Sequence, residues 1–228
     1  MLECRSCGAG APLDEHFCPQ CSRIMSLGRH GDYFAFLGLT RRLVLDPAEI
    51  EKRFRDLSRK FHPDYYYNAA PADRLASLER SSYLNDAYRA LKNPVSRIEH
   101  LLAIEGLPPA TSEEGTAKVP PSLLEEVFAL NEELDEIREA RESGADPERL
   151  RRRLDAAREP IEAKRQEHER QLQELSARWD ALANAPASER RQTLDALRER
   201  LLERNYINNL LATIEREGSG LTALGREP

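Results

Sequence analysis

Residues 47–64 read PAEIEKRFRDLSRKFHPD and combine an amphipathic helix with a sharp stop. Four apolar residues recur at helical spacing and form one face of this segment: Ile50, Phe54, Leu57 and Phe61. Three cations project roughly 160–180° away from that face, at about 100° per residue: Lys52, Arg55 and Arg59. A helix that buries one side and presents cations on the other favours an acidic binding partner.

The sequence specifies both ends of this helix. Asp46 can cap its start, Pro47 suits the first helical position, and Glu49 completes a capping-box pattern. The triplet His62-Pro63-Asp64 ends the helix, because the residue before a proline is driven out of the helical region. We therefore expect the side chains of the triplet to be displayed in a loop at the end of the charged face.

Residues 32–93 as a whole predict a helical hairpin. A short helix starts near Asp32 and is stopped by Gly38, and a third helix runs from about Pro71 to Lys92. The packing face of the third helix follows the spacing i, i+3, i+4 and i+7: Leu84, Ala87, Tyr88 and Leu91. The second and third helices would then pair antiparallel, with the triplet at the turn between them.

The composition limits the class of protein. The 228 residues suffice for two domains, and the abundance of Leu, Ala, Glu and Arg with only 6% aromatic residues predicts an all-α fold. The formal net charge of −6 disfavours general nucleic-acid binding, which needs a concentrated positive surface. No run approaches the roughly 20 apolar residues that span a bilayer. The N-terminus lacks the features of a signal peptide, so we expect a cytoplasmic protein.

Residues 1–27 are interpreted as a metal-binding segment. They contain two CxxC pairs with four thiols in all: Cys4, Cys7, Cys18 and Cys21. Structural zinc in a closed tetrahedral site is the leading interpretation, iron in a rubredoxin-like site is the second, and two disulfides are the third. Gly8 and Gly10 suit the backbone of the two metal knuckles. His16, between the pairs, is expected to be an ordinary loop residue.

Residues 94–228 predict a connecting segment, a helical bundle and a tail. The connecting helix and linker cover residues 94–120, and the bundle covers residues 121–217 with three antiparallel helices whose apolar stripes face a common core. Pro160 should kink or interrupt the second of these helices. Residues 110–119 and the tail, residues 218–228, are expected to be flexible.

The helix that begins at Pro121 carries more apolar residues than one packing stripe requires. The stripe itself has a heptad-like spacing: Leu123, Val127, Leu130, Leu134 and Ile137. Leu124 and Phe128 lie beside it, with Glu132 one turn further on. Two interpretations remain open, namely a wide buried face or an exposed apolar pair, rimmed by acids, that docks a partner. Leu202, Tyr206 and Leu210 suggest a second face on the last helix.

Several motifs resemble those of HscB-type J-domain co-chaperones, which act in iron–sulfur cluster biogenesis. The hairpin with its His62-Pro63-Asp64 triplet is the signature of the J-domain. Three further segments extend the resemblance over roughly residues 32–217: Asp32-Tyr33-Phe34, Asn93-Pro94 with the helix after it, and residues 132–136. The resemblance implies a J-domain hairpin plus a C-terminal three-helix bundle in an L-shaped body. The cysteine head, a small zinc-knuckle segment, resembles that of animal homologues.

The resemblance also implies a function and its residues. The J-domain would stimulate the ATPase of a DnaK/HscA-type chaperone, contacting it through these residues: His62, Pro63, Asp64, Lys52, Arg55 and Arg59. The bundle would bind the iron–sulfur scaffold protein and promote cluster transfer, with these contacts: Leu124, Phe128, Glu132 and Tyr206. Where family members carry Met and Glu beside the binding leucines, this chain has Glu125 and Ala129.

Three other classes of protein compete with this interpretation. An apolar groove and a Gly/Phe-rich linker would support a general J-protein that recruits unfolded clients, and neither is visible in the sequence. A zinc-ribbon nucleic-acid protein conflicts with the acidic charge balance. An enzyme is least expected, because no Gly-rich phosphate loop, nucleophile–base set or open metal position is recognisable.

Overall fold

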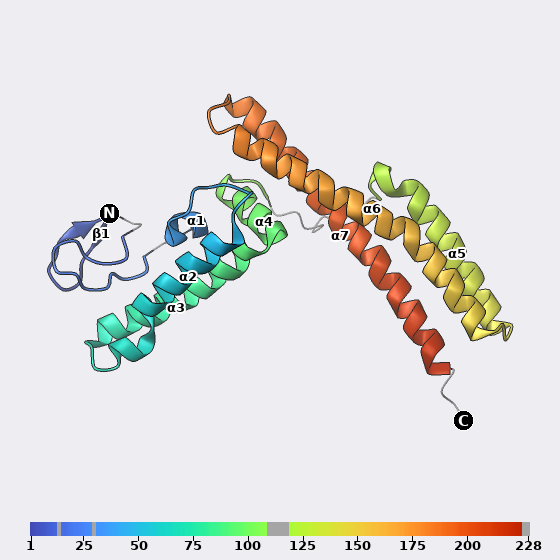
Figure 1. Cartoon of the computed structure of the whole chain (residues 1–228), viewed down its shortest axis with the longest axis horizontal. Helices are drawn as coiled ribbons and strands as arrows, with labels where there is room; N and C mark the ends of the chain where they lie inside the picture. The colour runs from blue at the N-terminus through green and yellow to red at the C-terminus, as the bar shows by residue number, and fades with distance from the viewer. Residues whose placement is uncertain (13–14, 29–30, 109–118, 225–228) are drawn as a thin grey trace. The chain divides into compact units, whose positions relative to one another are not determined.

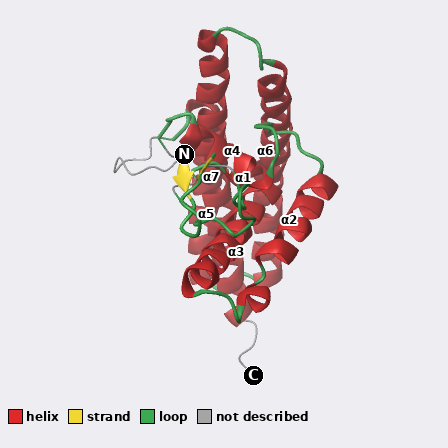
Figure 2. Cartoon of the chain, turned by 90° about the vertical axis from the view of Figure 1, so that its left-hand side faces the viewer, coloured by secondary structure: helices red, strands yellow, loops and turns green. Residues whose placement is uncertain are grey.

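The computed structural model describes residues 1–12, 15–28, 31–108 and 119–224, which fall into two compact units. The first unit comprises Met1–Pro109 with Trp179–Asn184, and the second comprises Ala110–Arg178 with Ala185–Pro228. Helices make up most of the described chain, and the strand drawn in Figure 2 lies near the N-terminus (Figures 1 and 2). This arrangement confirms the all-α fold class.

The head of the first unit is small and is the part that contains strands. Strand β1 (Leu2–Glu3) pairs antiparallel with β2 (Gly10–Ala11), and an isolated bridge joins Phe17 to Ile24. Its own core consists of four buried residues: Cys4, Ala11, Cys18 and Met25. So few buried side chains supply little hydrophobic stabilisation, which is why a segment of this size depends on a metal or on contacts with its neighbour.

Three helices of the first unit follow the sequence prediction. Helix α1 (Tyr33–Leu37) is capped by the carboxylate of Asp32 and ends at Gly38, whose φ of +65° suits glycine. Helix α2 (Pro47–Phe61) and helix α3 (Pro71–Lys92) pack against each other in Figure 1, joined by the short 3-10 helix η1, which follows His62.

Helix α4 (Pro94–Ile104) completes the first unit. Asn93 caps it, with its side-chain oxygen accepting from the amides of Val95 and Ser96. The core of the unit is rich in aromatic rings, and its fully buried members include the following: Phe34, Phe36, Phe61, Leu84 and Leu91. These rings fix the end of α2, and therefore the position of the triplet that follows it.

Three α-helices form the described part of the second unit. The 3-10 turn η2 (Pro121–Leu123) leads into α5 (Leu124–Glu142), followed by α6 (Pro147–Ala181) and α7 (Ala187–Leu224). Their aliphatic residues form one core, which includes the predicted stripe of α5: Leu123, Val127, Leu130, Leu134 and Ile137. Among the described residues, none of the helices has the length and apolar character needed to cross a membrane.

Two details of the second unit differ from the sequence prediction. The interruption offered as one outcome at Pro160 does not occur: helix α6 continues through it, because the exposed ring costs one backbone hydrogen bond that the rest of a 35-residue helix tolerates. Helix α7 continues past Gly218 to Leu224, because Leu221 is buried in the bundle core. Residues 225–228 of the predicted tail, and residues 110–118 of the predicted linker, lie outside the described residues.

Candidate functional site

Four cysteine sulfur atoms converge in the head. The Sγ atoms of Cys4, Cys7, Cys18 and Cys21 all lie within 4.8 Å of one another, and the Cys4–Cys21 and Cys7–Cys18 pairs are each 3.6 Å apart. A tetrahedral ion with metal–sulfur bonds of about 2.3 Å requires sulfur–sulfur edges of about 3.8 Å. All four cysteines are free thiols. The donor set therefore fits a tetrahedral metal ion and does not fit two disulfides.

The two CxxC segments share one backbone pattern. The amide of Gly8 donates to the carbonyl of Cys4, and the amide of Ser22 donates to the carbonyl of Cys18. Gly8 and Ser22 occupy equivalent positions and both have positive φ, at 74° and 58°. Gly10, which the sequence analysis assigned to a knuckle, lies in β2 instead. A serine in the left-handed region was not foreseen, because that conformation is normally read from glycine.

The knuckle backbone also prepares the thiols for a cation. Amide groups of Cys21 and Gln20 lower the pKa of Cys18 to about 7, against partial desolvation. The Ala9 amide favours the Cys7 thiolate, but desolvation and the neighbouring thiols together raise the pKa of Cys7 to about 12. Four thiols this close cannot all ionise by themselves, and a bound dication removes that conflict by stabilising every thiolate.

The His62-Pro63-Asp64 triplet lies where α2 ends and η1 (Pro63–Tyr66) begins. The side chains of His62 and Asp64 are 51% and 86% exposed, which confirms that they are displayed to solvent. The Nδ1 atom of His62 accepts a hydrogen bond from the amide of Asp64 at 3.4 Å. The ring of Tyr65 packs edge-on against the imidazole, with centroids 6.0 Å apart. The triplet is therefore a capped turn rather than an irregular loop.

The cationic face of α2 is exposed to solvent. The side chains of Lys52, Arg55 and Arg59 are exposed. Arg55 lies 3.9 Å from Glu51 and Arg59 lies 4.0 Å from Asp56, and both pairs are solvent-exposed. Exposed ion pairs of this length contribute little, so an acidic surface can displace them readily.

Leu124 and Phe128 form an exposed apolar pair on α5. Their side chains are 39% and 70% exposed, whereas the packing stripe beside them is buried. Of the two interpretations left open by the sequence, the structure therefore supports the exposed pair. Glu132 is also exposed on this helix, but Tyr206 lies on α7 with its ring partly covered by the bundle core. The structure thus places three of the four predicted scaffold contacts on one solvent-facing stripe.

A buried polar cluster holds the turn that precedes this pair. The hydroxyl of Ser122 donates to one oxygen of Glu203 on α7 at 2.8 Å, and Arg200 lies 2.6 Å from the other oxygen. The imidazole of His168 lies 3.7 Å from the same carboxylate and makes no hydrogen bond with the described residues. Burial lowers the pKa of His168 against the opposing effect of Glu203. Helical spacing did not predict this cluster, because its members come from segments far apart in the sequence.

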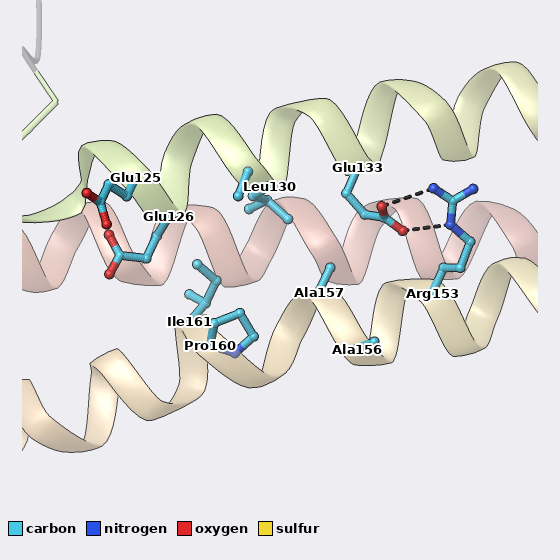
Figure 3. Close-up of a pocket in the computed structure, with 10 residues that line it drawn as sticks. Glu125, Glu126, Leu130, Glu133, Arg153, Ala156, Ala157, Pro160 and Ile161 are labelled. Carbon is cyan, nitrogen blue, oxygen red and sulfur yellow. Dashed lines mark hydrogen bonds and ion pairs between the residues drawn. The ribbon is translucent and has the colours of Figure 1, made fainter.

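A shallow pocket of about 500 Å³ lies between α5 and α6 (Figure 3). Its apolar part includes Pro160 and Ile161, and carboxylates lie at its two ends. Figure 3 shows Glu133 facing Arg153, with nitrogen–oxygen distances of 2.7 and 3.0 Å. Glu126 pairs with Lys164, which lowers the pKa of that carboxyl despite the opposing effect of burial. Both ion pairs join α5 to α6, and the Glu126–Lys164 pair lies at the end that carries the exposed apolar pair.

Comparison with known proteins agrees with the architecture of both units. Residues 32–100 match the DnaJ domain family. The crystal structure of human co-chaperone protein HscB is similar with a TM-score of 0.66 and 24% sequence identity, covering 94% of this chain and 98% of the human one. Chaperone HscB from Vibrio cholerae is similar with a TM-score of 0.60 and 28% identity, covering 83% of this chain and 99% of its own.

The fold and the displayed triplet define the class: this chain is a J-domain protein, with its DnaJ domain at residues 32–100. The likeness extends through the helical second unit in both solved structures. More particularly, the chain is similar over most of its length to HscB-type J-domain co-chaperones, and it carries a tetracysteine head able to bind a metal ion.

Proposed function

We propose that this co-chaperone stimulates the ATPase of a DnaK/HscA-type chaperone and delivers to it an iron–sulfur scaffold protein held on the second unit, promoting cluster transfer. One observation carries the proposal. The chain displays a capped His62-Pro63-Asp64 turn beside a free cationic face, and on a separate unit it displays the apolar pair Leu124 and Phe128. Each surface suits one partner.

The electrostatics of α2 suit an encounter with an acidic chaperone surface. Exposed cations accelerate association with such a surface more than they raise the final affinity. The imidazole of His62 and the carboxylate of Asp64 would then form hydrogen bonds at the chaperone and bias it toward hydrolysis. They act on another protein's active site, so the chain itself is proposed not to be an enzyme.

Single-turnover ATP hydrolysis by the chaperone tests the role proposed for the His62-Pro63-Asp64 turn. His62→Gln should reduce the stimulation by about tenfold or more, since a hydrogen bond involving a charged group is worth about 1.5 kcal/mol or more. Arg151→Gln, at an exposed position on α6, is the matched control and should leave stimulation unchanged. Equal stimulation by wild type and His62→Gln would refute the role assigned to the triplet.

Scaffold binding would occur on α5, through Leu124, Phe128 and Glu132, with Tyr206 contributing from α7. The double variant Leu124→Ala/Phe128→Ala should weaken scaffold binding by about 1–2 kcal/mol or more per side chain. Leu75→Ala removes an equally exposed leucine from the first unit and serves as the control. Wild-type affinity in the double variant would overturn this placement. Binding of an unfolded reporter protein, but not of the scaffold, would indicate a general J-protein instead.

The head is proposed to hold one structural zinc ion through the four cysteines, with iron the less favoured alternative. Four thiolates leave no open coordination position, so the ion would supply folding free energy rather than catalysis. Elemental analysis of protein purified without added metal tests the identity of the ion, and loss of the ion in Cys18→Ser tests the site. A cytoplasmic location remains a prediction that fractionation of cells would check.

A further inference from the structure

Arg80 on α3 is a charged side chain buried completely inside the first unit. Its relative exposure is 0%, which is rare for arginine unless every donor is paired. Nε donates to the backbone carbonyl of Met25 at 2.8 Å. Nη2 donates to the backbone carbonyls of Ser26 and Glu15 at 3.1 and 3.3 Å. Nη1 lies 2.7 Å from Nδ1 of His16. All of these partners belong to the cysteine head.

The head therefore supplies the acceptors that allow Arg80 to be buried. Burial lowers the pKa of Arg80 to about 10, so the guanidinium remains charged at neutral pH. A buried guanidinium that lost its acceptors would be strongly unfavourable, and it would have to turn toward solvent. The packing of Arg80 is consequently conditional on the folded state of residues 15–26.

The same guanidinium encloses the residue that ends α2. The ring of Phe61 is fully buried, and the Arg80 guanidinium carbon lies 5.7 Å from its centroid. His16 contacts Phe61 edge-on at 5.0 Å, and Phe17 lies 6.0 Å from it. His16 and Phe17 of the head and Arg80 of α3 therefore surround Phe61, the residue that directly precedes His62.

The carbonyl of Phe61 is fixed by the same helix. The hydroxyls of Ser77 and Ser81 donate to it at 2.6 and 2.9 Å, from positions that flank Arg80 on α3. A shift of Arg80 would therefore disturb both the ring and the carbonyl of Phe61. His62 follows immediately, and its side chain caps η1.

The segment that pairs with Arg80 also carries metal ligands. Cys18 and Cys21 lie between His16 and Met25, and the amide of Met25 donates to the carbonyl of His16 at 3.0 Å. The amide of Cys18 donates to Arg23 across the same hairpin. A hairpin with so small a core keeps this shape through the tetrahedral site, and metal loss would release the acceptors of Arg80.

We propose that Arg80 couples the cysteine head to the His62-Pro63-Asp64 turn, so that metal bound by the four cysteines holds the turn in its displayed conformation. Arg80 is a positioning residue in this scheme, since its side chain is buried and would act through Phe61. The consequence for ATPase stimulation rests on the proposed function, whereas the coupling itself requires only this chain and a metal ion in the cysteine site.

Hydrogen exchange of the full chain, with zinc and after removal of zinc by a high-affinity chelator, tests the coupling. Amides of residues 61–67 should exchange about tenfold faster or more without zinc, because local opening becomes easier. Peptides from residues 84–104 and from α7 should keep their protection. Faster exchange confined to residues 1–28 would overturn the proposal, and so would a uniform loss of protection throughout the first unit.

Arg80→Lys provides the matched variant, because it keeps the charge but not the planar fork that reaches several acceptors. With zinc bound, it should show the fast exchange at residues 61–67, and removing zinc should add little more. Arg89→Lys, at an exposed position on the same helix, should behave like wild type. A full additional response to zinc removal in Arg80→Lys would show that the coupling bypasses Arg80. If Arg80→Lys does not fold, the zinc comparison in wild type alone decides.

A second readout separates this proposal from the proposed function. Zinc-free wild type should stimulate the chaperone ATPase less than the zinc-loaded protein, by a loss that Arg80→Lys reproduces with zinc present. If the zinc-loaded wild type gives no stimulation at all, the proposed function fails, and the exchange experiment still tests the coupling. If stimulation is normal and unaffected by zinc, the coupling is refuted while the function stands.

Discussion

The two units of this protein are stabilised in different ways and display different chemistry. The first unit has an aromatic core with a buried arginine, and it presents polar side chains at the end of a helix. The second has an aliphatic core between long helices, and it presents an apolar pair on the side of a helix. A helix end frees polar groups for a partner, whereas a helix side frees apolar ones wherever its stripe is wider than the core requires.

Substitutions on α5 should give the largest effect on stability. Leu134 is 2% exposed, and Leu134→Ala should lower the free energy of unfolding of the second unit by about 2–5 kcal/mol. Phe128→Ala, on the same helix, should change it by less than about 0.5 kcal/mol, because that ring is exposed. Urea unfolding followed by hydrogen exchange in α5 measures both. Similar losses in the two variants would mean that Phe128 is a core residue and not a docking residue.

An intermediate effect is expected in the head. Ser22 has a left-handed backbone, which a β-branched side chain tolerates poorly. Ser22→Val should therefore weaken zinc binding by about 1–2 kcal/mol, while Ser22→Gly should stay close to wild type. Competition with a chromophoric chelator gives both affinities. Equal affinities for valine and glycine at this position would show that the second knuckle adapts its backbone.

The smallest effect concerns pH. Burial lowers the folded-state pKa of His168, with Glu203 opposing and Arg200 reinforcing the shift. The stabilisation is therefore fully present above the unfolded pKa of about 6.5, and it is lost as the pH falls through the lower folded pKa. The thermal stability of the second unit should decrease as the pH is lowered from about 7.5 to about 5, and His168→Gln should make that decrease smaller. An unchanged slope in the variant would assign the effect to other groups.

His100 offers the corresponding experiment in the first unit. Burial also lowers its pKa, with Asp32 opposing the shift. His100→Gln should flatten the pH dependence of the first unit and leave that of the second unit alone. Together the two variants separate the acid sensitivity of the aromatic core from that of the aliphatic one.

Local patterns in the sequence predicted most of the helices. The Asp46-Pro47 start and the His62-Pro63 stop gave the bounds of α2, and the leucine spacing identified the packing stripe of α5. The sequence allowed Phe128 to be either buried or exposed. Periodicity could not distinguish the two, because it does not show how wide the buried face of a helix is. The flexible tail was predicted to start at Gly218, which is too early, because burial of Leu221 in the bundle core extends α7 to Leu224.

The long-range polar contacts could not be read from local patterns. Arg80 and His16 are 64 positions apart, and Ser122 and Glu203 are 81 positions apart. Helical spacing assigns a residue to a face, but it does not say which distant donor or acceptor meets it there. His16 was accordingly expected to be an ordinary loop residue, whereas the structure places it between two aromatic rings and a buried cation.

The cap at His62 has a consequence for what can recognise it. When the imidazole of His62 is neutral and its Nδ1 atom accepts the Asp64 amide, the proton lies on Nε2, which can donate to a partner. A carboxylate follows two positions later and can only accept. In that state the turn presents a hydrogen-bond donor at His62 and an acceptor at Asp64, and a complementary surface presents an acceptor and a donor in the matching positions. Exchanging the two side chains would keep the composition and the net charge but would reverse the order of donor and acceptor along the turn.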